Sequence, residues 1–159
     1  FLALAGLWTR GSGTVSMPAR DRVMFLPERP YLPQTALAAV LAYPHDPAAF
    51  SEAAMHEALG EAGVGHLGKD LAVERRWEPD PSLGEKQMLA LALLMLHRPD
   101  WAFLDDAASA LDSDQARGVL AAIRQRLPGM AVIATSRDPD LLGFYDRIVR
   151  VRRRPPRQT

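Results

Sequence analysis

The stretch that decides the fold begins with Pro81-Ser-Leu-Gly-Glu-Lys-Gln87, continues through an apolar run from Met88 to Leu96, and ends in Trp101-Ala-Phe-Leu-Asp-Asp106. Ser82 and Glu85 have the spacing of a capping box, in which each side chain binds the backbone amide of the other residue. The first part therefore predicts a helix start, and the apolar run predicts that the helix is buried. The last part predicts a short buried strand that ends in two carboxylates.

A polar helix start and a strand that ends in carboxylates suit phosphate chemistry. Free backbone amides at a helix N-terminus bind anions, and Gly84 lets a ligand approach the backbone closely. In open α/β sheets, ligands bind at the carboxyl ends of the strands. Asp105 is expected to hold a magnesium ion, directly or through water, and Asp106 to position an attacking water. Taken singly, the two patterns are also compatible with a plain helix start and with a loop that caps a helix.

The ordered set of motifs resembles the ATP-binding domain of an ABC transporter. Ser82-Leu-Gly-Glu85 lies where the family signature Leu-Ser-Gly-Gly-Glu falls, with Pro81 replacing its leucine and Leu83 its first glycine. Phe103-Leu-Asp-Asp106 resembles the Walker B strand, and Ser109-Ala-Leu-Asp112 resembles the D-loop. Each motif is weak by itself, whereas their order is specific and the resemblance covers essentially the whole chain.

One subgroup of the family is indicated by the segment Phe25-Leu-Pro-Glu-Arg-Pro-Tyr-Leu-Pro33. It resembles the Q-loop segment of the peroxisomal fatty-acyl transporters and their bacterial relatives. Ala5-Gly-Leu-Trp8 and Leu83 point the same way.

The resemblance implies an α/β fold, a P-loop NTPase-like core with a mostly parallel sheet flanked by helices. It also implies a smaller helical subdomain that carries the signature. On this basis we expect the core to comprise residues 1–34 and 82–159. The helical subdomain and its connector should occupy about residues 35–81.

Three residues depart from the family pattern. Glu28 stands where the Q-loop has glutamine, Asp106 where the catalytic glutamate follows Walker B, and Ser136 where the switch histidine aligns. A carboxylate at Glu28 can still bind a magnesium-held water. Asp106 is one methylene shorter than glutamate, and Ser136 lacks the charge and proton chemistry of an imidazole. These changes imply slow hydrolysis or none, and an intact enzyme with unusual substitutions is the alternative.

The resemblance further implies that two such domains close head to tail on two ATP molecules with Mg²⁺. Asp106 and Ser136 would be the catalytic residues, Asp105 and Glu28 would serve magnesium, and Glu28 and Asp112 would couple the sites to each other and to the transmembrane helices. The residues expected to contact the ATP bound by the partner are Ser82, Leu83, Gly84 and Glu85. The expected partners are a second ABC domain, as a homodimer, and an N-terminally fused transmembrane domain. The expected location is the cytoplasmic face of a membrane, the inner membrane of a bacterium.

Three functions are compatible with these residues. The first is an ATPase domain that drives a transporter by nucleotide-driven dimerisation. The second is a catalytically impaired ABC domain with a structural or nucleotide-gated role. The third is a soluble ABC ATPase of DNA repair or translation, which the fatty-acyl-type Q-loop segment argues against. The transported cargo is set by helices outside the chain.

The family's P-loop, Gly-x-x-x-x-Gly-Lys-Ser/Thr, precedes the position of Ala5. We therefore expect a chain that begins just past this loop, with Leu2 to Leu7 as the tail of the next helix, and that is inactive by itself. Gly63-Val-Gly-His-Leu-Gly-Lys-Asp70 has the same glycine and lysine spacing but ends in a carboxylate. It follows a helical stretch, Pro47 to Ala62, rather than a strand, so we expect a helix-ending turn.

Composition excludes several classes of protein. The chain has 159 residues, enough for one domain with a core, and a formal net charge of zero, so no global field attracts nucleic acid. It has no cysteine, which excludes disulfides and thiolate metal sites. The terminus from Arg147 to Arg157 is locally basic and is expected to be a last strand and a solvated tail.

Periodicity predicts the remaining elements. Asp112 and Gln115 form a second cap pattern, which starts a helix with an apolar stripe at Val119, Leu120, Ile123 and Leu127. The other expectations are a strand Val23–Leu26, a helix Ala36–Ala42 capped by Thr35, a helix Ala48–Ala62, a connector Trp77–Pro81, a buried strand Met130–Ala134, a short helix Pro139–Phe144 and a strand Ile148–Val151.

Overall fold

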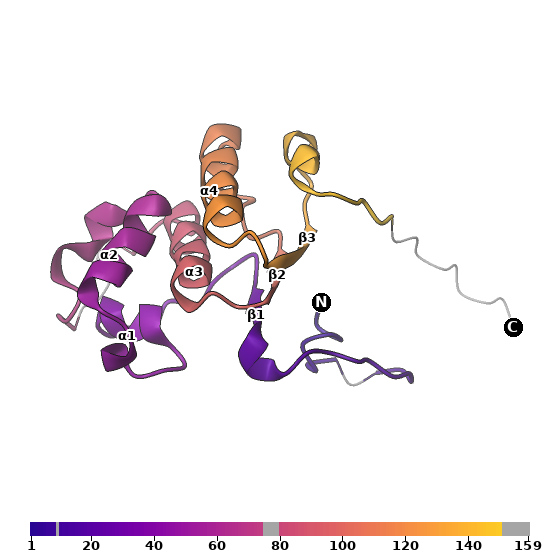
Figure 1. Ribbon diagram of the computed structural model, residues 1–159, viewed down its shortest axis with the longest axis horizontal. Helices are drawn as coiled ribbons and strands as arrows, with labels where there is room; N and C mark the ends of the chain where they lie inside the picture. Colours follow the sequence, from indigo (N-terminus) through magenta and orange to yellow (C-terminus); the bar gives the residue numbers. More distant parts are fainter. Residues whose placement is uncertain (9, 75–79, 151–159) are drawn as a thin grey trace, which may run out of the picture.

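A parallel sheet of three strands organises the molecule. The computed structural model describes residues 1–8, 10–74 and 80–150 (Figure 1). The strands are β1 (Val23–Leu26), β2 (Trp101–Asp105) and β3 (Ala131–Thr135), in the order β1-β2-β3. Both pairings are parallel, so the carboxyl ends of all three strands lie along one edge of the sheet. The α/β class and the parallel sheet are as the sequence predicts.

The helices cover the sheet and form a cluster beside it. Within the described residues the α-helices are α1 (Leu37–Ala42), α2 (Glu52–Glu61), α3 (Leu83–His97) and α4 (Ser113–Arg126). The 3₁₀ helices are η1 (Arg20–Arg22), η2 (Pro47–Ala49), η3 (Gly65–Asp70) and η4 (Pro139–Phe144). Figure 1 shows α1 and α2 gathered on the side of α3 that is remote from β3. None of the helices in the described part of the chain is long and apolar enough to cross a bilayer.

Helix α3 is the central helix of the core, and the sequence explains its limits. Ser82 and Glu85 form the predicted capping box at its start. The helix ends at His97, and Arg98 then adopts a left-handed conformation (φ 50°) before Pro99. Between these limits α3 packs against α1, α2 and α4. Its residues Leu91, Leu94 and Met95 have no exposed surface.

An ion-pair cluster joins α4 to α2. The Arg126 guanidinium donates to both Glu57 carboxylate oxygens (2.8 and 2.9 Å) and to Glu61 Oε1 (2.8 Å), while its own side chain is only 15% exposed. The hydrogen bonds and charge of Arg126 hold the pKa of Glu57 below its ordinary value. Arg126 therefore fixes the position of α2 relative to α4 through charge-assisted bonds rather than apolar packing.

Several sequence predictions need correction. Thr35 does not cap α1, whose N-cap is Ala36 and has no side-chain cap. The helix predicted over 48–62 is divided, because Ser51 caps a new helix at Glu52. The predicted tail helix over 2–7 is a series of turns, and residues 148–150 are not a strand. Strand β3 is partly exposed rather than buried, with Ile133 41% exposed. Val151 and residues 77–79 of the predicted connector lie outside the described residues.

The segment Gly63–Asp70, which has the glycine and lysine spacing of a P-loop, forms the predicted turn after a helix. Helix α2 ends at Glu61, Gly63 adopts φ 79°, and the 3₁₀ helix η3 follows. No strand leads into the segment, so it lacks the strand–loop–helix context of a P-loop.

The aromatic cluster at the end of α3 predicts a pH-dependent stability. His97 Nε2 donates to the Leu41 carbonyl oxygen (2.6 Å), and its ring contacts Phe50 and stacks on His45. Burial lowers the pKa of His97 from 6.5, more than the Leu41 hydrogen bond raises it, and the neighbouring His45 lowers it further. The unfolded chain therefore takes up the proton first as the pH falls.

The stability that neutral His97 contributes should be complete above about pH 6.5 and be lost as the pH falls below it. Urea unfolding at pH 7.5 and 5.5 should show a larger loss of stability for the wild type than for His97→Gln, which keeps a donor for Leu41. Equal losses in the two proteins would contradict this assignment.

Candidate functional site

A pocket of about 470 Å³ lies at the carboxyl ends of the three strands. Each strand delivers one candidate residue to its wall: Glu28 follows β1, Asp106 follows β2, and Ser136 follows β3. Leu83, from the first turn of α3, also lines it. The structure thus brings together four of the residues that the sequence predicts. Asp105, Ser82, Gly84, Glu85 and Asp112 do not line this pocket.

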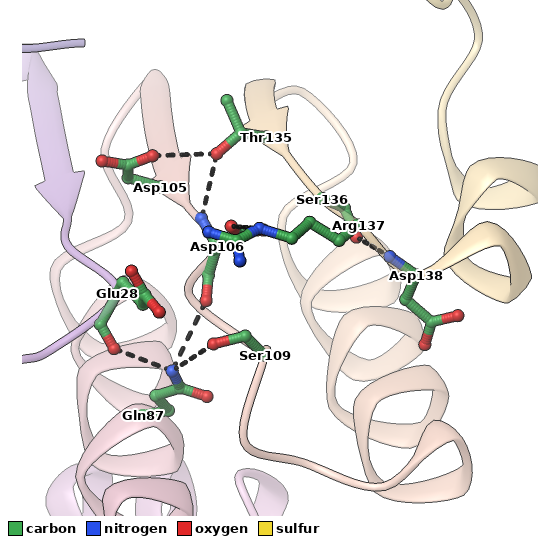
Figure 2. A network of polar contacts seen from close by, with 9 residues as sticks. All are labelled: Glu28, Gln87, Asp105, Asp106, Ser109, Thr135, Ser136, Arg137 and Asp138. Carbon is green, nitrogen blue, oxygen red and sulfur yellow. Dashed lines mark hydrogen bonds and ion pairs between the residues drawn. The ribbon is translucent and has the colours of Figure 1, made fainter.

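The two carboxylates at the end of β2 have different surroundings because they point in different directions (Figure 2). Asp105 Oδ1 accepts a hydrogen bond from the Thr135 hydroxyl at 2.9 Å. The same hydroxyl accepts from the Asp106 amide at 3.0 Å, and the Thr135 carbonyl oxygen accepts from that amide at 3.2 Å. Thr135 on β3 therefore fixes Asp105 and the backbone of Asp106 together. The sequence prediction missed this residue.

Asp106 is held in a conformation that few residues adopt. Its φ is 48°, in the left-handed region, where a side chain with a β-carbon is strained. Its side chain is 12% exposed, and Oδ2 lies 3.1 Å from Arg137 Nε. Figure 2 shows the Arg137 side chain extended toward Asp106. Strained residues held by their surroundings cluster at functional sites, which supports Asp106 as a candidate.

Arg137 supplies the positive charge of this pocket. Among the described residues that line it, Arg137 is the only cation, whereas Glu28, Asp106 and Asp138 are acidic. The Arg137 side chain is 84% exposed, so its donors remain accessible to an anion. Ser136 is turned differently, because its Oγ accepts from the Asp138 amide at 3.1 Å and closes a local turn. The residue that reaches Asp106 is therefore Arg137, not Ser136.

A buried glutamine ties the segments of the site together. Gln87 of α3 has no exposed surface. Its Nε2 donates to the Glu28 carbonyl oxygen (2.8 Å) and to Ser109 Oγ (3.1 Å), with the Asp106 carbonyl oxygen at 3.4 Å. Its Oε1 accepts from the Ala110 amide at 2.9 Å. Figure 2 shows the Gln87 side chain between the segments that follow β1 and β2.

The start of α3 carries the other half of the predicted site. The Ser82 hydroxyl donates to Glu85 Oε2 (2.8 Å) and accepts from the Glu85 amide (3.2 Å). Glu85 Oε1 also accepts from His66 Nε2 of η3 at 3.1 Å. Hydrogen bonds from the Ser82 amide and hydroxyl, and then from His66, lower the pKa of Glu85. Glu85 thus neutralises part of the positive helix end that would otherwise attract an anion.

Gly84 is required by the packing of the chain itself. A β-carbon at this position would lie 3.2 Å from the Ala110 carbonyl oxygen and 3.5 Å from a Leu111 methyl group. The sequence predicts that this glycine admits a ligand, and the structure adds that it admits the 109–112 loop.

Gly84→Ala should therefore displace the loop around Ala110 without unfolding the domain, since only a few tenths of an ångström are missing. Amide chemical shifts should change at 108–112 and stay constant in β1. The control is Gly118→Ala, in α4, where a β-carbon meets nothing within 4 Å. Unchanged shifts at 108–112 in Gly84→Ala would contradict the proposed contact.

Asp112 lies at the start of α4 and caps it. Its Oδ1 accepts from the Gln115 amide at 2.8 Å, and Gln115 Oε1 accepts from the Asp112 amide at 3.3 Å. The predicted second capping box is therefore present. In this structure the carboxylate binds its own helix rather than a neighbouring site.

The carboxylates fit a magnesium ion held mainly by water and phosphate. No group of three or more His, Asp or Glu side chains that would hold a metal occurs among residues 1–8, 10–74 and 80–150. Magnesium in phosphoryl-transfer sites is typically bound through one or two carboxylates plus waters and substrate phosphates. Asp105, half-buried beside the Thr135 hydroxyl, offers one such ligand. Glu28 lines the pocket, whereas Asp105 does not.

Two signals in the sequence point to residues that the prediction missed. Gln87 is the last polar residue before the apolar run of α3, and a buried polar residue needs partners. Arg137 directly follows Ser136 at the end of a strand. Neither signal identifies the partners, because Glu28, Asp106 and Ser109 are joined to Gln87 only by the fold.

Several curated proteins resemble this chain over most of its length. No family model matches the sequence. It is 37% identical over 131 residues to an uncharacterized ABC transporter ATP-binding protein of Haemophilus influenzae, covering 82% of this chain and 22% of that protein. It is 31% identical to the inner membrane ABC transporter ATP-binding protein YddA of Escherichia coli, covering 91% of this chain and 25% of that protein. It is 30% identical to ABC transporter D family member 2 of Dictyostelium discoideum, covering 94% and 21%.

A solved structure gives the same result for the fold. A bacterial Atm1-family ABC exporter with ATP bound superposes with a TM-score of 0.60 at 26% identity, covering 72% of this chain and 21% of the exporter chain. The chain thus spans about a fifth to a quarter of the length of these four proteins. From its sequence relatives and its fold, the chain belongs to the ATP-binding domains of ABC transporters, with D family members among its relatives.

Proposed function

We propose that this chain is part of an ATP-binding and ATP-hydrolysing domain that powers a membrane transporter. The observation that carries the proposal is the convergence of Glu28, Asp106 and Arg137 on one pocket at the carboxyl ends of the strands. The relatives named as ABC transporter proteins support it, one of them an inner membrane protein. The proposed location is therefore the cytoplasmic face of a membrane, that of a bacterial inner membrane, beside transmembrane helices fused on the N-terminal side.

In the proposed reaction, Asp106 orients a water molecule for attack on the terminal phosphorus of ATP. The oxygen of that water forms a bond to phosphorus, the bond to the ADP oxygen breaks, and the proton of the water passes to phosphate or solvent. Arg137 would hold the Asp106 carboxylate in place and offset negative charge on the phosphate. A magnesium ion bound through Asp105 would supply charge neutralisation between the phosphates.

The start of α3 would serve a second nucleotide. Ser82, Leu83, Gly84 and Glu85, the proposed signature residues, would contact ATP bound by another copy of the domain, and Asp112 would couple the two sites. The Ser82 hydroxyl, which now donates to Glu85, would redirect its proton to a phosphate oxygen. Domain closure would occur with ATP rather than without it, because the nucleotide supplies the phosphate oxygen that accepts this proton.

A second candidate function is favoured by the contact between Asp106 and Arg137. A guanidinium 3.1 Å from the carboxylate competes with a water molecule for it. A domain in which this pair persists would bind ATP and close without efficient hydrolysis, as a nucleotide-gated partner.

The two functions are separated by ATP binding and single-turnover hydrolysis in the full-length protein that carries this chain. Binding together with hydrolysis above the uncatalysed rate supports the first function. Binding with hydrolysis at background, restored by Asp106→Glu with Arg137→Gln, supports the second. Absence of ATP binding would contradict both.

A further inference from the structure

We propose that Gln87 is a positioning residue that holds the segments around the pocket in register. Only the expected effect of Gln87 on hydrolysis rests on the proposed function, because its contacts are those of the protein without ligand. Gln87 lies on α3, whose first turn carries Ser82 and Glu85. Its side chain reaches away from that turn, to the segments that carry Glu28 and Asp106.

The partners of Gln87 fit one orientation of its side-chain amide. Three oxygens surround Nε2, from Glu28, Ser109 and Asp106, and one amide donor faces Oε1, from Ala110. Reversing the side-chain amide would place its oxygen against the Glu28 and Asp106 carbonyl oxygens and its nitrogen against the Ala110 amide, so only one orientation satisfies the network. A fully buried polar group with such partners selects one arrangement of its neighbours, because every alternative leaves donors or acceptors unpaired.

The segments joined by Gln87 come from different parts of the chain, and the loop after β2 is closed by local backbone bonds from the Ser109 amide to the Asp106 carbonyl oxygen and from the Leu111 amide to the Ala108 carbonyl oxygen. Glu28 lies in a stretch with prolines at positions 27, 30 and 33, which supply no backbone donors. Ser109 and Ala110 are exposed residues of a loop between β2 and α4. Asp106 has a strained backbone, and its own amide is bound to Thr135 on the opposite side. One side chain on a rigid helix thus sets the positions of the β1 segment and the β2 loop together.

This role differs from that of a catalytic residue, because Gln87 is completely buried and lies outside the residues that line the pocket. We expect it to act through Asp106 and Glu28. Its loss should lower the rate of hydrolysis more than the affinity for nucleotide.

The test compares Gln87→Met with wild type in the full-length protein. Methionine keeps the length and volume of the side chain and removes all four contacts. Hydrogen exchange without nucleotide should speed up about ten-fold or more at the Ala110 amide, which loses its acceptor, and also rise across residues 28–32. Exchange in β2 and in the Leu89–Leu96 part of α3 should stay constant. The control is Gln125→Met, the same change at an exposed position of α4.

With Mg-ATP, the Kd of Gln87→Met should stay within about three-fold of wild type while kcat falls about ten-fold or more, a split that general destabilisation does not produce. Rescue toward wild-type exchange by Gln87→Glu at low pH, where the protonated carboxyl group regains one donor, would further support the role. Unchanged exchange at Ala110 and 28–32, or a uniform increase throughout the domain, would overturn it. Because exchange is measured without nucleotide, these outcomes stand even for a protein that fails to bind ATP.

Discussion

Asp106→Asn should lower the single-turnover rate of ATP hydrolysis by about two to four orders of magnitude, the range typical for removal of a general base or water-positioning group. The affinity for ATP should change little, because asparagine keeps the size of the side chain. The physical reason is the loss of the carboxylate that faces the pocket, 12% exposed and fixed by the Thr135 contacts to its backbone. Quench-flow measurement of ADP formation in the full-length protein checks this expectation.

The matched control is Asp114→Asn. Asp114 lies on the exposed surface of α4, where its side chain pairs with Arg117 and is 89% exposed. This substitution removes the same charge away from the pocket and should leave the rate unchanged. Equal rates in wild type and Asp106→Asn, both clearly above the uncatalysed reaction, would show that Asp106 is not the residue that positions water.

Leu94→Ala should destabilise the domain by about 3 kcal/mol, within the range of roughly 2–5 kcal/mol for truncation of a buried leucine. Leu94 has no exposed surface, and it lies on α3, which packs against α1, α2 and α4. The substitution removes three carbon atoms from that contact and leaves a cavity that a helix packed on several sides cannot close. Urea unfolding followed by tryptophan fluorescence measures the change.

Leu7→Ala serves as the control, because it makes the same chemical change at a residue that is 72% exposed. Its stability should remain within about 0.5 kcal/mol of wild type. A loss below about 1 kcal/mol in Leu94→Ala would contradict the central place of α3 in the core.

Much of the fold is predictable from local signals. The two capping boxes start α3 and α4 at the predicted residues, because a cap depends on side chains only three positions apart. The apolar runs at Val23 and Trp101 become neighbouring parallel strands. Where local signals compete, prediction fails: Thr35 and Ser51 are both good cap residues, but only Ser51 accepts a bond from the helix that follows it.

The candidate site is predictable only in part, since its chemistry depends on which segments the fold brings together. Glu28, Asp106 and Ser136 all follow strands, so a parallel sheet places them at one edge. The contacts of Asp106 with Arg137 and of Gln87 with Ala110 join residues that no short motif links. Side-chain direction decides these contacts: Ser136 turns toward Asp138 while its neighbour Arg137 reaches Asp106.

In the proposed function, Ser82 at the start of α3 completes an ATP site on a second copy of the domain. Because the 159 residues contain no cysteine, Ser82→Cys introduces a single reporter thiol into this part of the protein. Ser82 is exposed here, so the thiol should react readily with a maleimide in the absence of nucleotide. The measurement is the labelling rate of Ser82→Cys in the full-length protein, otherwise cysteine-free, with Mg-ATP, with Mg-ADP and without nucleotide. Mg-ATP should protect the thiol strongly, and the more so at higher protein concentration, whereas Mg-ADP should give little protection. Equal labelling under all three conditions, in a protein shown to bind ATP, would contradict this role of Ser82.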